Sequence, residues 1–339
     1  MQAIILAGGL GTRLRPVTYF RPKALIPLLN RPMVLHIIEA LPEVVDEVII
    51  AASYMIEALE DFFDSHPPDV KVTIVDEEEP LGTGGALKNL EGLVNGTFLT
   101  INGDVISSLL AEDFVAFHEK SGGIGTLALW KVENPEAYGI VGMNEEGRID
   151  RFLEKPSRGE IFSKLANAGI YALEEEILSM IPDGRAVSLE REVFPRAIER
   201  GLYGMTFKGY WADAGTLENY LSATRILLDR KGSAVGKGCV IHSEAGILDP
   251  VCMGTSTVLR GGFVGPYVGL GQACDLGSAK IANSVLFDGV RVEEGVIIEA
   301  SLIGSEATIG RDSRIQNCIV ADQAEIPKGS KLIGERVGR

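Results

Sequence analysis

Cysteine and histidine are scarce in this chain, with four of each among 339 residues. The cysteines form no C-x-x-C pair and the histidines have no metal-ligand spacing, so a zinc site or a redox motif is unsupported. Basic residues are also few, 32 Lys and Arg against 47 Asp and Glu. The resulting net charge of −15 argues against a nucleic-acid partner, because such binding relies on Lys and Arg to neutralise phosphates.

Long hydrophobic runs are missing as well. No stretch of about 18 apolar residues is free of charge, and the chain turns apolar at once without a basic lead-in. We therefore expect no membrane partner and a cytoplasmic protein. Apolar residues still make up 46% of the sequence, which is usual for folded domains. Because 339 residues exceed what one hydrophobic core usually supports, two domains are expected.

Residues 1–230 alternate short apolar runs with segments of helical apolar spacing. The runs that are apolar on both faces, as buried strands are, cover residues 4–7, 48–53, 72–76 and 97–102. The helical segments cover residues 32–41, 55–63 and 84–93. This alternation predicts an α/β domain with a Rossmann-like, mostly parallel sheet and helices on both faces. A hairpin at 138–154 and an extended run at 167–173 are expected to add a substrate lobe.

A helix beginning near Gly215 is predicted to end at Gly232, and we place the domain boundary there, so that residues 231–339 form the second domain. In this part aliphatic residues recur every six positions. They are Val235, Ile241 and Ile247, then Val258, Val264, Leu270 and Leu276, then Ile303, Ile309 and Ile315. The period predicts a parallel β-helix in which each aliphatic side chain points inward, whereas a β-sandwich would show a period of two.

The glycine-rich segment 8–28 follows directly after the first apolar run. Glycine lets backbone N–H groups approach a phosphate closely, so this turn predicts an anion cradle. Leu14 stands where a dinucleotide fingerprint needs glycine, and Arg13 stands where a Walker loop needs it, so neither pattern fits. Arg13 and Lys23 are suited to stabilise charge on a triphosphate as its α,β bond breaks.

Residues 8–27 resemble the signature of the nucleotidyltransferases that make nucleotide sugars. The resemblance covers essentially the whole chain and extends to the segments Asn102-Gly103-Asp104, Glu154-Lys155-Pro156, Asn167-Ala168-Gly169 and Trp211-Ala212-Asp213-Ala214-Gly215. The repeats resemble the left-handed β-helix of the hexapeptide-repeat families, carried by many members including the GDP-mannose pyrophosphorylases. Spacing alone does not give the hand. The family implies an enzyme that joins a nucleoside triphosphate to a sugar 1-phosphate and releases pyrophosphate.

The resemblance also implies the site residues. The catalytic residues would be Arg13, Lys23 and Asp104, and Asp104 with Asp213 would hold Mg²⁺, the expected cofactor. The nucleotide would be bound by Leu6, Ala7, Gly8, Gly9, Gly11, Thr12, Glu77, Gly82 and Thr83. The sugar phosphate would be bound by Gly139, Glu154, Lys155, Asn167 and Gly169.

Physical arguments support some of these roles and leave alternatives for others. Asp104 follows a predicted strand at its carboxyl end, where open α/β sheets bind ligands. Asp213 would otherwise be a turn or cap residue in its glycine-flanked segment. Lys155 is a compact cation suited to a phosphate monoester. Glu154 would otherwise form an ion pair with a neighbouring basic residue.

The acidic run at residues 77–79 bears on the choice of base. Relatives that use uridine or thymidine triphosphates commonly have a glutamine at the position matching Glu77. An ionised carboxylate only accepts hydrogen bonds, which suits the adjacent N–H donors of guanine. Residues 79–86 also resemble guanylyltransferases for mannose or heptose phosphates, so we expect GTP and mannose 1-phosphate. The alternative is a solvated loop in which Glu78 or Glu79 faces inward.

Other functions stay open at this point. One is a glucose-1-phosphate thymidylyl- or uridylyltransferase. A regulatory paralogue without catalysis could lose its cations and carboxylates, yet here they are present. A bifunctional enzyme with an acyltransferase β-helix usually needs a histidine base, and only His242 lies in the repeats. We expect the β-helix to assemble a homo-oligomer and to perform no chemistry of its own.

Overall fold

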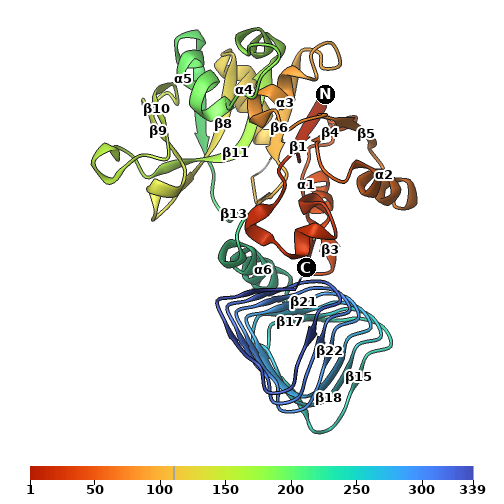
Figure 1. Ribbon diagram of the computed structural model, residues 1–339. Coiled ribbons are helices and arrows are strands. Elements are labelled where there is room, and N and C mark those ends of the chain that lie inside the picture. Colours follow the sequence, from red (N-terminus) through yellow and green to blue (C-terminus); the bar gives the residue numbers. More distant parts are fainter. Residues whose placement is uncertain (110, 339) are drawn as a thin grey trace. The chain divides into compact units, whose positions relative to one another are not determined.

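The computed structural model describes residues 1–109 and 111–338 (Figure 1). They form two compact units, one of Met1–Leu10 with His36–Trp211 and the other of Gly11–Leu35 with Ala212–Arg339. These units divide after Leu10, Leu35 and Trp211, and the domain boundary placed after residue 230 stays a prediction. No helix in the described part of the chain is both long enough and apolar enough to span a membrane.

The first unit is built on one sheet. Its main strands are β1 (Gln2–Leu6), β4 (Glu47–Ala52), β5 (Lys71–Asp76), β6 (Thr97–Asn102), β8 (Gly125–Lys131), β9 (Gly139–Met143), β10 (Ile149–Glu154), β11 (Leu165–Glu174) and β12 (Leu202–Thr206). The helices around it (Figure 1) are α1 (Met33–Glu39), which begins in the second unit, and α2 (Ile56–Ser65), α3 (Gly82–Lys88), α4 (Ala111–Ser121) and α5 (Phe194–Ala197). All four apolar runs and all three helical segments of the sequence are therefore confirmed. The exception in burial is β5, which is only partly buried because it is the edge strand.

The order of the strands distinguishes one strand of the sheet, β1, from the others. Strands run β10-β9-β11-β6-β1-β4-β5, and β8 joins β11 to β12. Strand β1 pairs in parallel with β4 on one side and β6 on the other, so the chain changes direction across the sheet at β1. Strand β11 is antiparallel to β6 and β8, which makes the sheet mixed rather than mostly parallel. Ligands of open α/β sheets bind at such a change of direction, beyond the carboxyl ends of the strands.

The core of the first unit combines aliphatic strand residues with a group of aromatic rings. Phe98, Tyr171 and Phe194 are fully buried, and the rings of Tyr171 and Phe194 meet edge to face with centroids 4.9 Å apart. The predicted hairpin is confirmed as β9 and β10, which pair antiparallel. Its strands extend the sheet next to β11.

The second unit joins a short segment with a β-helix. The segment has three 3₁₀ turns, η1 (Thr12–Leu14), η2 (Val17–Tyr19) and η3 (Lys23–Leu25), and two short strands, β2 (Pro27–Leu28) and β3 (Arg31–Pro32). The predicted helix is α6 (Leu217–Lys231), where Thr216 accepts a hydrogen bond from the Asn219 N–H as N-cap. Gly232 ends this helix with a φ of 72°, as expected.

The β-helix is a stack of coils joined by parallel strand pairs, seen end on in Figure 1. One column of strands comprises β14 (Ala234–Val235), β17 (Val251–Met253), β19 (Val268–Leu270), β21 (Val285–Leu286), β24 (Leu302–Ile303), β27 (Ile319–Val320) and β30 (Arg336–Val337). The others are β15 (Val240–Ile241), β16 (Ala245–Ile247), β18 (Val258–Val264), β20 (Asp275–Ala282), β22 (Arg291–Val292), β23 (Ile297–Glu299), β25 (Thr308–Ile309), β26 (Arg314–Gln316), β28 (Glu325–Ile326) and β29 (Lys331–Ile333). The prediction of a β-helix is thus confirmed, while its left hand stays a prediction.

The repeat differs from a strict period of six in one respect. Partners such as Val264 and Ile281 lie 17 positions apart, and Leu270 and Leu286 lie 16 apart. A coil of 16 or 17 residues is shorter than three repeats of six. The spacing between inward-pointing residues is therefore shorter than six at one place in each coil, and the inward positions shift there. The inward residue near 258 is accordingly Leu259, which is fully buried, and the assignment of Val258 to the interior is wrong.

The first coil also departs from expectation. Val235 and Ile241 occupy the predicted columns, since they pair with Met253 and Leu259. They are nevertheless 54% and 43% exposed. A terminal coil has a neighbour on one side only, and therefore its aliphatic side chains stay open to solvent.

Candidate active site

The carboxyl ends of β1 and β6 lie side by side where the sheet changes direction. Leu6 ends β1, Ala7 donates its N–H to the Ala51 carbonyl at 2.7 Å, and the Gly103 N–H donates to the Leu6 carbonyl at 2.9 Å. Asp104 follows Gly103 in a turn and is half-buried. The structure thus brings the glycine turn next to the turn of Asp104, which follows β6 at its carboxyl end as predicted.

Gly8 lies directly against the carboxylate of Glu77. A Cβ atom on Gly8 would come within 2.8 Å of Glu77 Oε1, so only glycine fits there without displacing the carboxylate. The Gly8 carbonyl accepts a hydrogen bond from Ser53 Oγ at 2.7 Å. Gly9, the next residue, has open space around it. The turn is therefore tight at Gly8 and accessible at Gly9.

Glu77 is the buried member of the acidic run. It follows β5, is 3% exposed, and its Oε2 accepts a long hydrogen bond from the Leu81 N–H at 3.4 Å. Its Oε1 is buried and has no hydrogen-bond partner. Burial raises the pKa of this carboxyl, since the ionised form loses its hydration. Glu78 and Glu79 are exposed, so the alternative in which one of them faces inward is wrong.

Gly82 and Thr83 begin α3 and contact the segment around residue 188. Gly82 has a φ of 71°. The Thr83 hydroxyl donates to Glu190 Oε2 at 2.7 Å and accepts from the Leu189 N–H at 2.9 Å. The hydroxyl is thus engaged within the protein, and nucleotide binding by Thr83 stays a prediction.

A bulge in β11 shapes the predicted sugar pocket. The pairing of β11 with β8 shifts between Asn167 and Tyr171, and Gly169 within this shift has a φ of 73°. Asn167 Oδ1 accepts from the Gly169 N–H at 3.0 Å and its Nδ2 donates to the Tyr171 hydroxyl at 2.8 Å. A Cβ on Gly169 would come within 2.6 Å of Asn102 Nδ2, which requires glycine here and sets the bulge against the end of β6.

The hairpin supplies the carboxylate of the predicted sugar site. Glu154 and Gly139 are register partners, and a Cβ on Gly139 would lie 2.6 Å from Glu154 Oε2. Burial and the nearby Glu190 raise the pKa of Glu154, whereas Lys155 and Arg191 oppose this. The Lys155 Nζ is 3.9 Å from Glu154 Oε1 and its side chain is 56% exposed, so the two form a loose pair rather than a closed ion pair.

Glu190 is a polar neighbour of Tyr171 and Thr83 that the sequence did not indicate. It lies on a π-helical turn, η7 (Leu189–Val193), and accepts from Ser188 Oγ at 2.7 Å and from the Tyr171 hydroxyl at 3.3 Å. No motif spans the distance from Thr83 to Glu190, so only the fold could identify it. Tyr171, by contrast, stands two residues after Gly169, the last residue of the Asn167-Ala168-Gly169 segment, so its position next to this segment could have indicated it.

Arg13 and Lys23 belong to the segment 11–35 of the second unit. Gly11 has a φ of 60° and its carbonyl accepts from Thr18 Oγ1 at 3.0 Å. A Cβ on Gly11 would lie 3.4 Å from the Lys23 Cβ, so the segment folds back on itself and returns Lys23 to Gly11. Thr12 and Arg13 are exposed and Lys23 is half-buried.

Asp213 precedes α6 in the second unit. Its Oδ1 accepts from the Gly215 N–H at 3.2 Å and from Asn219 Nδ2 at 2.7 Å, so it does serve the turn role considered as an alternative. These bonds also fix the direction of the carboxylate. The pairing of Asp213 with Asp104, which lies in the first unit, stays a prediction. No cluster of three or more His, Cys, Asp or Glu side chains suited to a metal occurs among residues 1–109 and 111–338.

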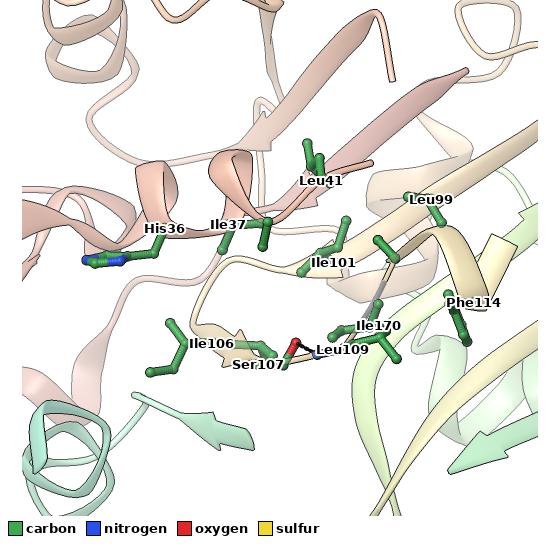
Figure 2. A pocket seen from close by; sticks show the side chains of 13 residues that line it. His36, Ile37, Leu41, Leu99, Ile101, Ile106, Ser107, Leu109, Phe114 and Ile170 are labelled. Atoms are coloured by element: carbon green, nitrogen blue, oxygen red, sulfur yellow. Dashed lines mark hydrogen bonds between the residues drawn. The ribbon is translucent and has the colours of Figure 1, made fainter. Parts of the chain in front are cut away.

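An apolar cavity of about 40 Å³ lies next to the Asp104 turn. Figure 2 shows side chains from α1, β6, α4 and β11 around it, among them Ile37, Ile101, Phe114 and Ile170. The hydrogen bond drawn there joins the Leu109 N–H to Ser107 Oγ at 3.4 Å. A cavity lined almost wholly by hydrocarbon suits neither phosphate nor sugar, so the candidate site is the polar surface along Gly8, Glu77, Asn167 and Glu154.

The fold and this surface define an α/β protein with polar residues gathered where its sheet changes direction. Comparison with known families identifies the class of protein. Residues 2–230 match the model described as nucleotidyl transferase, and residues 247–337 match the one described as GMPPB C-terminal domain. The chain belongs to the nucleotidyl transferase family, which confirms the resemblance.

Relatives cover nearly the whole chain. Mannose-1-phosphate guanylyltransferase 1 of Arabidopsis thaliana is 37% identical, with 94% of this chain and 90% of that protein aligned. Mannose-1-phosphate guanylyltransferase of Mycobacterium tuberculosis is 36% identical over 88% and 83%. A putative glucose-1-phosphate thymidylyltransferase from Bacillus anthracis has a TM-score of 0.61 at 27% identity, covering 68% of this chain and 96% of that one. HddC from Yersinia pseudotuberculosis, complexed with GMP-PN, has a TM-score of 0.56 at 26% identity, over 67% and 99%.

Proposed function

We propose that this protein is a mannose-1-phosphate guanylyltransferase, which converts GTP and mannose 1-phosphate to GDP-mannose and pyrophosphate in the cytoplasm. The observation that carries the proposal is Glu77, a buried carboxylate with an unpartnered oxygen against the glycine turn. It is supported by relatives over nearly the full chain that are named mannose-1-phosphate guanylyltransferases.

Glu77 accounts for the choice of base. Guanine presents two adjacent N–H donors on its pairing edge, and a carboxylate presents two acceptors at matching spacing. The pairing edge of uracil or thymine carries carbonyl oxygens on either side of one N–H, and that of adenine carries an unprotonated nitrogen. Those groups would be repelled by an ionised Glu77. A buried acceptor that lacks a partner in the protein is stabilised when the ligand supplies one.

The pocket of Glu154 and Asn167 is assigned to the sugar. A half-buried carboxylate and a buried amide beside Gly139 and Gly169 offer acceptors and donors to hydroxyl groups. Lys155, exposed at the end of β10, supplies a cation for the phosphate of mannose 1-phosphate. The identity of the sugar is drawn from the names of the relatives, while the polar pocket accounts for binding a polyol.

Asp104 and Asp213 fit a magnesium ion in their chemistry. Mg²⁺ prefers oxygen ligands and is commonly held by one or two carboxylates together with substrate phosphates. Asp213 is oriented by two hydrogen bonds to one of its oxygens, as outer partners orient a ligating carboxylate. When bound, the ion would offset negative charge on the phosphates.

The reaction then needs little from the protein beyond positioning and charge. A phosphate oxygen of mannose 1-phosphate attacks the α-phosphorus of GTP in line, the bond from that phosphorus to the bridging oxygen breaks, and pyrophosphate leaves with the electron pair. Arg13 and Lys23 stabilise the transferring and leaving phosphates. Because the nucleophile is already an anion, no general base is required.

A grid of substrates tests this function. We expect the purified protein to use GTP with mannose 1-phosphate more efficiently than UTP, dTTP or ATP, and more efficiently than with glucose 1-phosphate. One phosphoanhydride is broken and one is made, so pyrophosphate and GDP-mannose should regenerate GTP. A higher kcat/KM for UTP or dTTP would instead favour the thymidylyl- or uridylyltransferase, and no turnover of any pair would favour the regulatory paralogue.

We further propose that the protein is a homo-oligomer assembled through the β-helix. The first coil exposes Val235, Val240 and Ile241, which are 54%, 48% and 43% exposed, beside strand edges that have no further coil to pair with. We expect sedimentation at micromolar concentration to give more than one subunit, and Ile241→Glu to shift the protein to smaller species. A wild-type monomer under these conditions would contradict the proposal.

A further inference from the structure

The segment 11–35 is attached to the β-helix by a buried ionic and aromatic contact within the second unit. Arg21 donates from Nη2 to the carboxylate of Asp322, with which it forms an ion pair, and to Ser305 Oγ at 3.0 Å. The Arg21 guanidinium also stacks over the Phe287 ring, 4.9 Å from its centroid. Asp322 is 9% exposed and Phe287 is 2% exposed, so the contact is largely shielded from water.

Two more hydrogen bonds hold the same segment at other points. Arg336 Nη1 donates to the Arg15 carbonyl at 2.8 Å, and Asn30 Nδ2 donates to the Leu270 carbonyl at 2.8 Å. The attachment thus involves several successive coils and both ends of the segment. Arg21 lies near the middle of the segment, two residues before Lys23, and it makes the ion pair of this attachment.

Asp322 occupies a recurring corner of the β-helix. Its Oδ1 accepts from the Ser305 N–H at 3.1 Å, which leaves Oδ2 for Arg21. Asp288 makes the same corner bond two coils earlier, where its Oδ1 accepts from the Gln272 N–H at 2.9 Å. Its Oδ2 accepts from Gln272 Nε2 at 3.2 Å, and the residue is exposed. The corner does not by itself require the ion pair, and Asp288 is therefore a matched control for Asp322.

We propose that Asp322 and Arg21 are positioning residues for nucleotidyl transfer, and that the β-helix holds the segment carrying Arg13 and Lys23 in its working conformation. This inference rests on the proposed roles of those two cations. Cations stabilise a transition state only as far as they are placed in advance, and small misplacements of catalytic groups are costly. A long segment with little regular structure of its own gains that placement from an external anchor. The β-helix thereby acts on the reaction as well as on assembly.

The test compares Asp322→Asn, Arg21→Lys and their double variant with Asp288→Asn in the full-length protein. An Asn at 322 can still accept from the Ser305 N–H, so the corner is preserved while the ion pair is lost. We expect kcat to fall about 10-fold or more in both single variants. The double variant should be no slower than the slower single one, because the two residues act as one unit. The KM for mannose 1-phosphate should change less than about twofold, since the sugar pocket lies in the first unit.

Hydrogen exchange over residues 11–35 is measured on the same proteins, because it reports the anchor without depending on activity. Faster exchange in Asp322→Asn than in Asp288→Asn, together with the loss of kcat, supports the inference. Faster exchange with unchanged kcat contradicts the role of the anchor in the reaction, and it leaves the proposed roles of Arg13 and Lys23 standing. Unchanged exchange, or equal losses in both aspartate variants, overturns the anchor itself. If Asp322→Asn fails to fold, Arg21→Lys and Ser305→Ala provide the same comparison.

Discussion

Changing Asp104 or Asp213 to Asn is expected to lower kcat by about 10² to 10⁴, since a divalent cation in phosphoryl transfer contributes several kcal/mol of charge stabilisation. Asn keeps the size of the side chain and removes its charge. Asn at position 213 can still accept from the Gly215 N–H and from Asn219, so the turn before α6 should survive. A loss of activity then reports the charge and not the turn.

The measurement is kcat as a function of Mg²⁺ concentration, with a thermal melt to verify folding. Asp69→Asn is the control, because Asp69 is an exposed aspartate outside the proposed site. We expect both site variants to need more Mg²⁺ as well as to turn over more slowly. Near-normal rates with the same Mg²⁺ dependence in either variant would show that its carboxylate does not hold the metal.

Glu77→Gln is expected to lower kcat/KM for GTP by about 10- to 100-fold, as hydrogen bonds to a charged group contribute about 1.5–3 kcal/mol. The amide would place a donor against a donor of guanine, and the preference for GTP over UTP should narrow. Glu78→Gln is the matched control, since Glu78 is the exposed neighbour. An unchanged preference in Glu77→Gln would contradict the assignment of the base contact.

The pH dependence gives a second test of Glu77. Burial raises its pKa above the ordinary glutamate value, so the carboxyl becomes protonated at a less acidic pH than an exposed one. A protonated carboxyl loses acceptor capacity, and the KM for GTP should therefore rise as the pH falls through the raised pKa. Glu77→Gln should lack this rise.

The stability of Glu77→Gln should change in the opposite sense to its activity. A carboxyl with a raised pKa in the folded state favours folding when protonated, and this contribution is lost as the pH rises above the ordinary glutamate pKa. Removing the buried charge should accordingly make the protein slightly more stable at neutral pH than the wild type.

The local features of this protein could be predicted from the sequence, because each depends on residues that are neighbours in the chain. An apolar run followed by glycine predicts a strand and a tight turn wherever it occurs, so β1 and the Gly8 turn needed no tertiary information. The recurrence of aliphatic residues identified the β-helix for the same reason, since each residue stacks on its equivalent in the next coil. The hairpin of β9 and β10 and the helix α6 are similar cases.

Burial, and contacts between residues far apart in the chain, could be seen only in the tertiary structure. Whether an aliphatic side chain is buried depends on a coil above and below it, which is why Val235 and Ile241 are exposed and Leu259 replaces Val258 inside. The burial of Glu77 beside Gly8, the hydrogen bond of Thr83 to Glu190 and the attachment of Arg21 to Asp322 join residues far apart in the chain. No local pattern encodes such contacts, because they form only when separate elements pack. The sequence alone thus determined the elements and the chemistry of the motifs, and packing determined which carboxylates are buried and what holds the segment 11–35 in place.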